Sequence, residues 1–481
     1  MKKISIDGFK DVKKVHLIGV GGVSMSAIAQ MLHLNGYEVT GSDNTPSEQT
    51  EILQNAGIPI QIGHDTKMID GADVVIYSAA IPEDDPERVE AKKLNIPSME
   101  RGKFIGMLTK HYSDSISISG THGKTTTTSL ITDIFLEAQL DPTVQVGAYL
   151  KEIRGNYRIG KSDYFILESC EYRDSFLYFY PKTEIILNID ADHLDYFKNI
   201  DNLVKSFKKF TDNITHDGML IINSMDIHTK DVIEHVKKYN KENDRNIKIY
   251  TFGIDEGDFI ATDIKYTDGK PTFIIKDTIN NEEQEIELNV SGSHNVLNST
   301  AAYAASRLNG VDKETIAAGM KRYYGAHRRF EYKGSVNGAK IYDDYAHHPT
   351  EVKALSETVK NQNYNKSYAI FEPHTFSRTK AFYKNFAESL SNFDNIVVTK
   401  IYPAREKPDP TISGEDIVKV LKEKGKNAIY LETFRDIKKY IYENVKENDL
   451  VITIGAGDVT NLGNVLSETK NKDVVITIVR K

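Results

Sequence analysis

The sequence predicts an α/β protein built from three consecutive α/β domains. Three observations support this prediction. Short apolar segments of strand length alternate with longer segments whose apolar residues recur at helical spacing. A glycine-rich turn follows the first apolar segment, and a Gly-Lys-Thr sequence follows a later one. Because strands that alternate with helices are joined by crossover connections, the sheets are expected to be mainly parallel.

The first domain is predicted at residues 1–107. A buried strand begins at Val15 and enters a Gly-Val-Gly-Gly turn that ends at Gly22. The next predicted elements are a helix at 24–35 and strands at 37–43 and 73–78.

The central domain is predicted at residues 108–326. Its predicted elements are a strand at 115–118, a helix at 125–137, and strands at 163–168 and 184–189. The polar segment 255–287 is expected to form a decorating β-hairpin, because Asp268-Gly269 is typical of a turn between two alternating strands.

The third domain is predicted at residues 327–481. Its predicted strands lie at 339–343, 368–371, 395–399 and 450–454. Each is followed by a longer segment, as in the two preceding domains, so the same α/β organisation is expected.

Composition limits the classes of function. The 481 residues are 40% hydrophobic and 27% charged, as in an ordinary globular protein. The net charge of −8 argues against a general nucleic-acid or membrane-surface binder. The single cysteine, Cys170, excludes an internal disulfide framework. Because the N-terminal segment also lacks an apolar signal region, a cytoplasmic location is predicted.

The stretch ISISGTHGKTTTT at 116–128 predicts a shortened phosphate-binding loop between a strand and a helix. Its glycines, Gly120 and Gly123, are closer together than in the usual pattern. Free N–H groups at the helix start attract phosphate oxygens, Lys124 could neutralise the outer phosphates, and the Thr125 hydroxyl could bind Mg²⁺. The alternative is a simple turn that caps the helix, with Lys124 in solvent.

The first glycine turn, Gly19-x-Gly21-x-x-Ser24, approximates a dinucleotide-binding fingerprint, and Asp43 ends the next strand. This weak pattern is compatible with NAD, FAD or a nucleotide-sugar diphosphate. A second nucleotide site before a phosphate loop is unusual for a dehydrogenase, so another ligand is expected in the first domain.

Further motifs extend over nearly the whole chain. In order they are HLIGVGGVSMS, GTHGKTTT, ESCE, NIDADHLD, GSHNVLN, HRRFE, DDYAHHPTEV, FEPHTFSRT and GAGDVTNL. Together they resemble the Mur ligase family of peptidoglycan synthesis. GTHGKTTT is typical of the whole superfamily, whereas DDYAHHPTEV, FEPHTFSRT and GVGGVSMS together resemble its alanine-adding branch. The resemblance implies a Rossmann-like N-terminal domain, a P-loop-type central domain and a Rossmann-like C-terminal domain.

The resemblance also implies an activity. A ligase of this branch joins L-alanine to the lactyl carboxylate of UDP-N-acetylmuramate through an acyl phosphate and releases ADP and phosphate. Such an enzyme serves cell-wall synthesis, and through it cell shape and division. ATP, Mg²⁺ at two sites and small-molecule substrates are expected, with no nucleic-acid or membrane partner. The expected oligomeric state is a monomer or weak homodimer.

Outside the amino-acid site, the residues that match family positions fall into four groups. The implied catalytic residues are Lys124, Glu168, His193 and Arg329. The implied metal ligands are Thr125, Glu168 and His193. The implied ATP contacts are Gly120, Thr121, His122, Gly123, Lys124, Thr125, Thr126, Asn295, Asn298, Arg329, Asp344 and His348. The implied UDP-sugar contacts are Gly19, Gly21, Gly22, Val23, Ser24, Met25, Asp43 and Ser78.

The third domain is expected to hold the amino acid. Arg378 is suited to a bidentate pair with its carboxylate, and Tyr345 and His374 are implied as supporting residues. Thr375 stands where many relatives carry arginine, so the contacts to alanine can differ here. Lys208 lies at the distance from His193 at which some sister ligases carry a carbamylated lysine, although a solvated helix lysine is the simpler interpretation.

Each of these assignments has a purely structural alternative. Glu168 could cap a turn, His193 could pack in a polar loop, and Asn295 could belong to a helix cap. The pair His347-His348 could suggest zinc, but a zinc site needs three or four convergent ligands. Competing functions are a sister ligase that adds a peptide or another amino acid, a non-enzymatic nucleotide-binding regulator, and a dehydrogenase. The dehydrogenase leaves the Gly-Lys-Thr loop unexplained.

Overall fold

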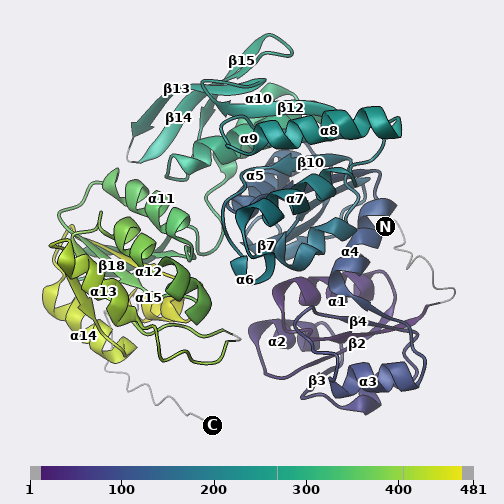
Figure 1. The fold of residues 1–481 in the computed structure, drawn as a ribbon, viewed down its shortest axis with the longest axis horizontal. Helices are drawn as coiled ribbons and strands as arrows, with labels where there is room; N and C mark the ends of the chain where they lie inside the picture. Colours follow the sequence, from purple (N-terminus) through teal and green to yellow (C-terminus); the bar gives the residue numbers. More distant parts are fainter. Residues whose placement is uncertain (1–11, 268, 405, 468–481) are drawn as a thin grey trace. The chain divides into compact units, whose positions relative to one another are not determined.

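A computed structural model describes residues 12–467 apart from positions 268 and 405 (Figure 1). The described residues form two compact units, one made mostly of residues up to Ala326 and the other mostly of residues from His327 onward. Their three sheets are mainly parallel, and the predicted α/β fold class is confirmed. Among the described residues, no helix is long and apolar enough to cross a membrane.

The first sheet is parallel and has five strands in the order β3-β2-β1-β4-β5. These strands are β1 (Lys14–Ile18), β2 (Glu38–Asp43), β3 (Ile60–Ile62), β4 (Val74–Tyr77) and β5 (Ser98–Glu100). The accompanying helices are α1 (Val23–Leu34), α2 (Glu48–Asn55), η1 (Thr66–Ile69), α3 (Pro86–Lys93) and α4 (Arg101–His111). The strand order reverses beside β1, and the glycine turn that follows β1 lies at this switch point, where open α/β sheets bind ligands.

The second sheet has ten strands in the order β15-β14-β13-β12-β11-β10-β6-β9-β7-β8. The strands are β6 (Asp114–Ser119), β7 (Thr143–Leu150), β8 (Gly155–Arg158), β9 (Tyr164–Glu168), β10 (Thr183–Ile186), β11 (Met219–Asn223), β12 (Lys248–Ile254), β13 (Phe259–Thr267), β14 (Lys270–Asp277) and β15 (Glu282–Glu287). Its helices are α5 (Lys124–Glu137), η2 (Tyr172–Tyr178), α6 (Leu194–Phe197), α7 (Ile200–Thr211), α8 (Thr229–Asn243), α9 (His294–Leu308) and α10 (Lys313–Arg322).

Strand β6 lies in the middle of this sheet, between β10 and β9, and both neighbours run parallel to it. The carboxyl ends of these three strands therefore meet at one edge. The loops that leave them carry GTHG, ESCE and NIDADH. The topology thus brings together three motifs that are far apart in the chain.

The segment predicted as a decorating hairpin is part of the second sheet. Strand β13 pairs in parallel with β12, and β15 pairs antiparallel with β14, so the strands extend the sheet edge. The predicted turn residue Asp268 lies outside the described residues, whereas Gly269 has a φ of +74°.

The third sheet has six strands in the order β16-β17-β21-β18-β19-β20 and is parallel except for β16. The strands are β16 (Glu331–Val336), β17 (Ala339–Asp344), β18 (Ser367–Phe371), β19 (Asn395–Val398), β20 (Asn427–Tyr430) and β21 (Leu450–Ile454). The helices are α11 (Pro349–Lys360), α12 (Phe376–Leu390), α13 (Gly414–Glu423), α14 (Phe434–Asn444) and α15 (Val459–Ser467).

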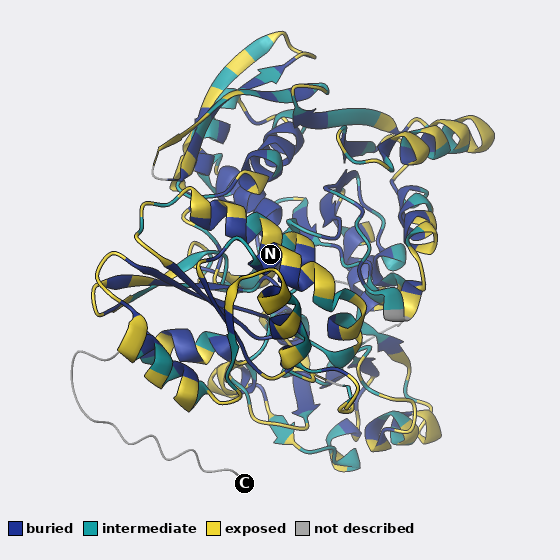
Figure 2. Ribbon diagram, turned by 60° about the vertical axis from the view of Figure 1, so that its left-hand side comes forward, coloured by how far each residue is buried: buried dark blue, intermediate teal, exposed yellow. Residues whose placement is uncertain are grey.

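Burial follows these layers. Figure 2 shows buried residues along the inner strands and exposed residues on the outer faces of helices. One apolar cluster continues from the first sheet into the second and includes Val15 and Phe165. A Cβ on Gly106 of α4 would collide with the Tyr178 carbonyl oxygen. This glycine therefore lets α4 and η2 approach closely within the first unit.

Candidate active site

The predicted phosphate-binding loop connects β6 to α5. Gly120 has a φ of +129° and Gly123 a φ of +86°, a region that side chains rarely adopt. A Cβ on Gly123 would also collide with the Asn298 side-chain oxygen. The shortened spacing is thus compatible with a tight loop whose glycines are required by geometry. The N-cap residue of α5 is Gly123, which has no side chain to cap the helix, so the first amides of α5 are suited to binding an anion.

The loop is held from the β10 side. Asn188 bonds His122 in both directions: the His122 N–H donates to Asn188 Oδ1 at 2.8 Å, and Asn188 Nδ2 donates to the His122 carbonyl at 3.0 Å. His122 Nε2 also lies 3.1 Å from Asp190 Oδ2. The Thr121 hydroxyl donates to the Asp190 carbonyl at 3.1 Å. The NIDADH segment therefore supports the loop that GTHG forms.

Lys124 begins α5, and its side chain turns toward ESCE. Its Nζ donates to Glu171 Oε2 at 3.0 Å, to the Thr121 carbonyl at 3.1 Å and to the Gly120 carbonyl. Burial alone lowers the pKa of Lys124, but the acidic groups around it, Glu171 first and then Cys170 and Glu168, together more than offset this and raise the pKa to about 12. Lys124 is therefore a fixed positive charge at the loop.

Glu168 lies at the carboxyl end of β9, as predicted. Its Oε1 accepts a hydrogen bond from the Gly147 N–H of β7 at 2.6 Å. A Cβ at Gly147 would lie 2.7 Å from Glu168 Oε2, so the glycine leaves room for this carboxylate. Glu168 is thus oriented by backbone on its own sheet and can offer oxygen to a cation.

His193 follows β10 and faces the ESCE loop. Its Nε2 lies 3.8 Å from Glu171 Oε1, and its ring centroid is 4.7 Å from that of Tyr172. The backbone here is unusual, because His193 (φ +53°), Arg173 (φ +54°) and Asp174 (φ +57°) all adopt left-handed conformations. Such strain concentrates at functional sites, where surrounding contacts maintain it.

The first turn of α5 also contains Thr125 and Thr126, and each side chain is buried with 8% exposure. In α9, Asn298 Nδ2 donates to Asn295 Oδ1 at 3.2 Å, and the Asn298 side chain abuts Gly123. The structure therefore brings Asn298 to the phosphate loop. The nucleotide and metal roles of these four residues remain predictions.

The glycine turn after β1 is tied to the end of β2. The Gly21 N–H donates to Asp43 Oδ2 at 2.8 Å, and a Cβ on Gly21 would lie 2.9 Å from the same oxygen. Gly19 has a φ of +81°, and a Cβ there would lie 3.2 Å from the Ser78 side chain. Four of the predicted UDP-sugar residues are thus adjacent in space.

The remaining residues of that turn have other environments. Ser24 Oγ accepts a hydrogen bond from Gln145 of β7 at 2.5 Å, and the Val23 carbonyl accepts one from Asn156 at 2.7 Å. Met25 is 2% exposed and packs in the apolar core, whereas Gly22 precedes α1 as its cap residue. These contacts link the turn to the second sheet.

In the second unit, Asp344 ends β17 and its carboxylate is held by backbone. Oδ1 accepts from the Ala346 N–H and Oδ2 from the Phe330 N–H, both at 2.8 Å. Burial raises the pKa of Asp344 to about 6, although the nearby Arg329 lowers it. The Arg329 guanidinium lies 5.5 Å from the centroid of the Tyr345 ring. These three predicted residues therefore share one environment.

The FEPHTFSRT motif follows β18. An Arg378 guanidinium nitrogen lies 3.3 Å from His374 Nδ1, and the His374 ring stacks on Tyr402 with centroids 5.6 Å apart. Thr375 caps α12, accepting from the Arg378 N–H at 3.4 Å, and has a φ of +68°. Thr375 therefore shapes the start of this helix. The contacts of Arg378 to an amino acid remain a prediction.

Two predicted residues have evident structural roles. His348 caps α11, with Nδ1 accepting from the Thr350 N–H at 3.4 Å, and its ring packs against Phe382 with centroids 5.2 Å apart. Lys208 of α7 is 27% exposed and lies 3.8 Å from Asp231, as a solvated helix lysine would. The ATP contact of His348 remains a prediction.

Several residues at these sites were not assigned a role from the sequence. They are Glu171, Asn188, Asp190, Arg328 and Glu372. All five lie inside motifs already noted, so their position beside assigned residues was the available signal. Arg328 donates to Asp343 Oδ2 at 3.1 Å. Burial raises the pKa of Glu372 to about 7, and Oε2 accepts from the Val459 N–H at 3.1 Å.

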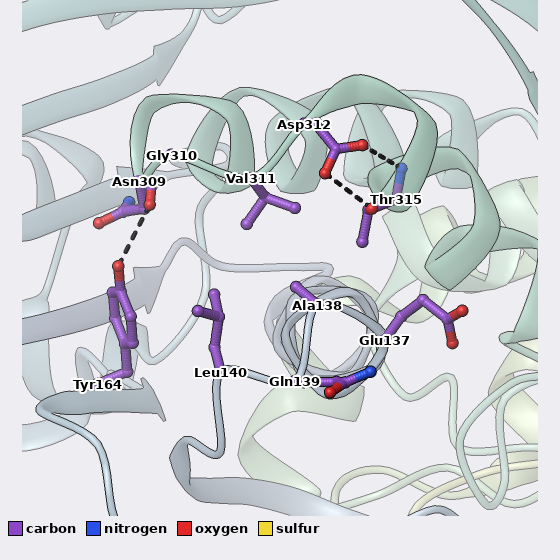
Figure 3. A pocket seen from close by; sticks show the side chains of 10 residues that line it. All are labelled: Glu137, Ala138, Gln139, Leu140, Tyr164, Asn309, Gly310, Val311, Asp312 and Thr315. Atoms are coloured by element: carbon purple, nitrogen blue, oxygen red, sulfur yellow. Dashed lines mark hydrogen bonds between the residues drawn. The ribbon is translucent and has the colours of Figure 1, made fainter.

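A separate cavity of about 490 Å³ lies where α5 ends, between α5 and the α9–α10 connection (Figure 3). The Tyr164 hydroxyl donates to the Asn309 carbonyl at 3.2 Å across one side. The phosphate loop is at the other end of α5. None of the predicted site residues lines this cavity, so it is not the candidate active site.

Comparison with known proteins bears on the whole chain. Residues 14–113 match the family model described as "Mur ligase family, catalytic domain". Residues 118–306 match "Mur ligase middle domain", and residues 328–457 match "Mur ligase, glutamate ligase domain".

Individual relatives agree. The UDP-N-acetylmuramate–L-alanine ligase of Clostridium novyi is 44% identical over 95% of this chain and 98% of its own length. That of Caldanaerobacter subterraneus is 43% identical over 96% and 98%. The crystal structure of UDP-N-acetylmuramate-alanine ligase MurC from Thermotoga maritima has a TM-score of 0.79 and 28% identity, and covers 95% of this chain and 98% of that one. The chain belongs to the Mur ligase family.

Proposed function

We propose that this protein joins L-alanine to the lactyl carboxylate of UDP-N-acetylmuramate and consumes ATP in doing so. The observation that carries the proposal is the 43–44% identity, over nearly the full length of the chain, to proteins named UDP-N-acetylmuramate–L-alanine ligase. The convergence of Lys124, Glu168 and His193 at one sheet edge supports it, because these groups suit phosphoryl transfer to a carboxylate.

The first step activates a poor electrophile. The sugar carboxylate attacks the γ-phosphorus of ATP, and the bond from that phosphorus to the bridging oxygen breaks. ADP departs, and the carboxylate has become an acyl phosphate. Lys124 and the amides at the start of α5 stabilise the negative charge on the transferred group. Asn188 and Asp190 keep the loop in position during this transfer.

The Thr125 hydroxyl and the Glu168 carboxylate offer the oxygen ligands that Mg²⁺ prefers, and His193 would add an imidazole nitrogen beside bound water. Magnesium held there would neutralise the phosphate and acyl oxygens. We expect two sites, because both the nucleotide and the acyl phosphate become rich in charge.

In the second step the neutral amine of alanine attacks the acyl carbon, the carbon–oxygen bond to phosphate breaks, and the nitrogen loses one proton, which leaves with the departing phosphate. We assign Arg378 to the alanine carboxylate, with Tyr345 and His374 beside it. The UDP-sugar diphosphate is assigned to the turn from Gly19 to Ser24. Titration of the full chain with UDP-N-acetylmuramate and with NADH tests that assignment, and preferential binding of NADH would overturn it.

An amino-acid panel tests the function. Phosphate release is measured with ATP, Mg²⁺ and UDP-N-acetylmuramate plus alanine, glycine, serine, D-glutamate or a peptide that begins with L-alanine. We expect alanine to give the highest kcat/KM. A clear preference for the peptide would identify the sister activity. Phosphate release that is equally fast without any acceptor would contradict ligation.

A further inference from the structure

Glu171 lies between two groups of the proposed active site and has no role in the reaction described above. One carboxylate oxygen accepts from Lys124 Nζ at 3.0 Å, and the other lies 3.8 Å from His193 Nε2. The Glu171 side chain is only 1% exposed. A carboxylate so deeply buried is costly unless it is paired, so its partners are significant.

The hydrogen bonds of Lys124 account for its whole donor capacity. An ammonium group has three N–H donors, and Lys124 uses them on the Gly120 carbonyl, the Thr121 carbonyl and the Glu171 carboxylate. The two carbonyls belong to the loop itself. The carboxylate is the only one of the three acceptors that carries a full negative charge, and it therefore competes directly with a phosphate for the lysine.

We propose that Glu171 is a positioning residue that holds Lys124 while the nucleotide is absent and yields it to the phosphate when ATP binds. When Lys124 moves, the His193 side chain is still within reach of the Glu171 carboxylate. Glu171 then orients the His193 ring together with Tyr172, whose ring packs on it at 4.7 Å. The inference rests on the proposed function for the identity of the phosphate donor.

This role predicts opposite effects on binding and on turnover. Glu171→Gln keeps the shape and removes the charge that competes for Lys124. We expect a nonhydrolysable ATP analogue to bind the variant about tenfold more tightly, equivalent to about 1.4 kcal/mol. We expect kcat to fall about 100-fold or more, because Lys124 and His193 lose the carboxylate that positions both side chains. A residue that only supports the fold would weaken both.

The experiment uses the full chain. Calorimetric titration with the ATP analogue is done without sugar nucleotide or alanine, and phosphate release is measured separately. The matched control is Glu137→Gln, at the opposite end of α5, where Glu137 pairs with Arg322; it should leave affinity and kcat unchanged. In a Lys124→Met background, Glu171→Gln should no longer affect analogue affinity, as a double-mutant cycle requires.

Weaker or unchanged analogue binding by Glu171→Gln, or an unchanged kcat, would overturn the proposal. A persistent affinity gain in the Lys124→Met background would do so as well, because Glu171 would then act by another route. If Glu171→Gln does not fold, Glu171→Asp is measured instead. Its shorter side chain should also tighten analogue binding, and weaker or unchanged binding would count against the idea. Ligation of alanine by the wild-type protein is measured independently. Failure of that assay would contradict the proposed function, whereas the variants test only the role of Glu171.

Discussion

Asp133 provides a quantitative test of the structure. It lies in α5, the helix that begins at Lys124, and is 4% exposed. Among the described residues, neither of its carboxyl oxygens has a hydrogen-bond partner. Burial, together with the charge of Glu152, raises the pKa of Asp133 from its ordinary value of 3.8 to about 8, although Arg322 opposes this. The folded protein therefore keeps this group protonated at neutral pH, whereas the unfolded chain ionises it.

The sign follows from proton linkage. Below pH 3.8 the carboxyl is protonated in both states and costs nothing. As pH rises, only the unfolded chain ionises, so stability falls until the folded group ionises near pH 8. One pKa unit corresponds to about 1.4 kcal/mol, so the cost at pH 7 is about 4 kcal/mol.

Asp133→Asn removes this titration. The buried amide is as poorly hydrogen-bonded as the acid, but the free-energy cost of burying it does not depend on pH. We therefore compare the variant with the wild type by urea unfolding at pH 5 and pH 7. The stability difference should shift in favour of Asp133→Asn by about 2.7 kcal/mol between these values, at about 1.4 kcal/mol per pH unit.

The control is Glu285→Gln, an exposed position on β15, for which the difference should not change with pH. A difference for Asp133→Asn that is equal at pH 5 and pH 7 would refute the reasoning. It would mean that Asp133 is hydrated or paired in solution.

Three further predictions concern the site. Lys124→Ala should lose about 3 kcal/mol or more of transition-state stabilisation, roughly 100-fold in kcat, in a phosphate-release assay, and near wild-type turnover would contradict the loop assignment. Gly123→Ala should weaken ATP-analogue binding at least tenfold by titration, because φ is +86° and the new Cβ meets Asn298; unchanged affinity would show that the loop adapts. Arg378→Lys should raise the KM for alanine about tenfold and leave the KM for ATP unchanged, since lysine cannot form a bidentate pair; equal effects on both would disprove a specific carboxylate contact.

Local pattern was sufficient for most elements. The last predicted strand is observed as β21, with the bounds expected for it, Leu450–Ile454. The strand predicted at 184–189 ends instead at Ile186 in β10. Its final residues leave the ladder because Asn188 bonds the phosphate loop through its side chain and its carbonyl. A strand boundary set by a distant loop has no local signature.

The polar segment near residue 270 shows the same limit. Alternating residues and an Asp-Gly pair indicated strands there, and strands are present. The pairing of β13 with β12, which makes them part of the main sheet, depends on which edge is open in the assembled fold. Alternation along one segment does not specify its neighbour.

By itself the sequence determined the α/β class and the order of the strands and helices along the chain, and it predicted which residues bind phosphate. Those properties depend on periodicity, on glycines with unusual backbone angles and on motif chemistry, all of which are local. Only the tertiary structure decided that Lys124 and His193 meet at Glu171. Their contact arises because β6 pairs with β9 and β10 in parallel, which brings three separate loops to one edge of the sheet. Such pairing is a cooperative property of the packed core, and no spacing within one motif contains it.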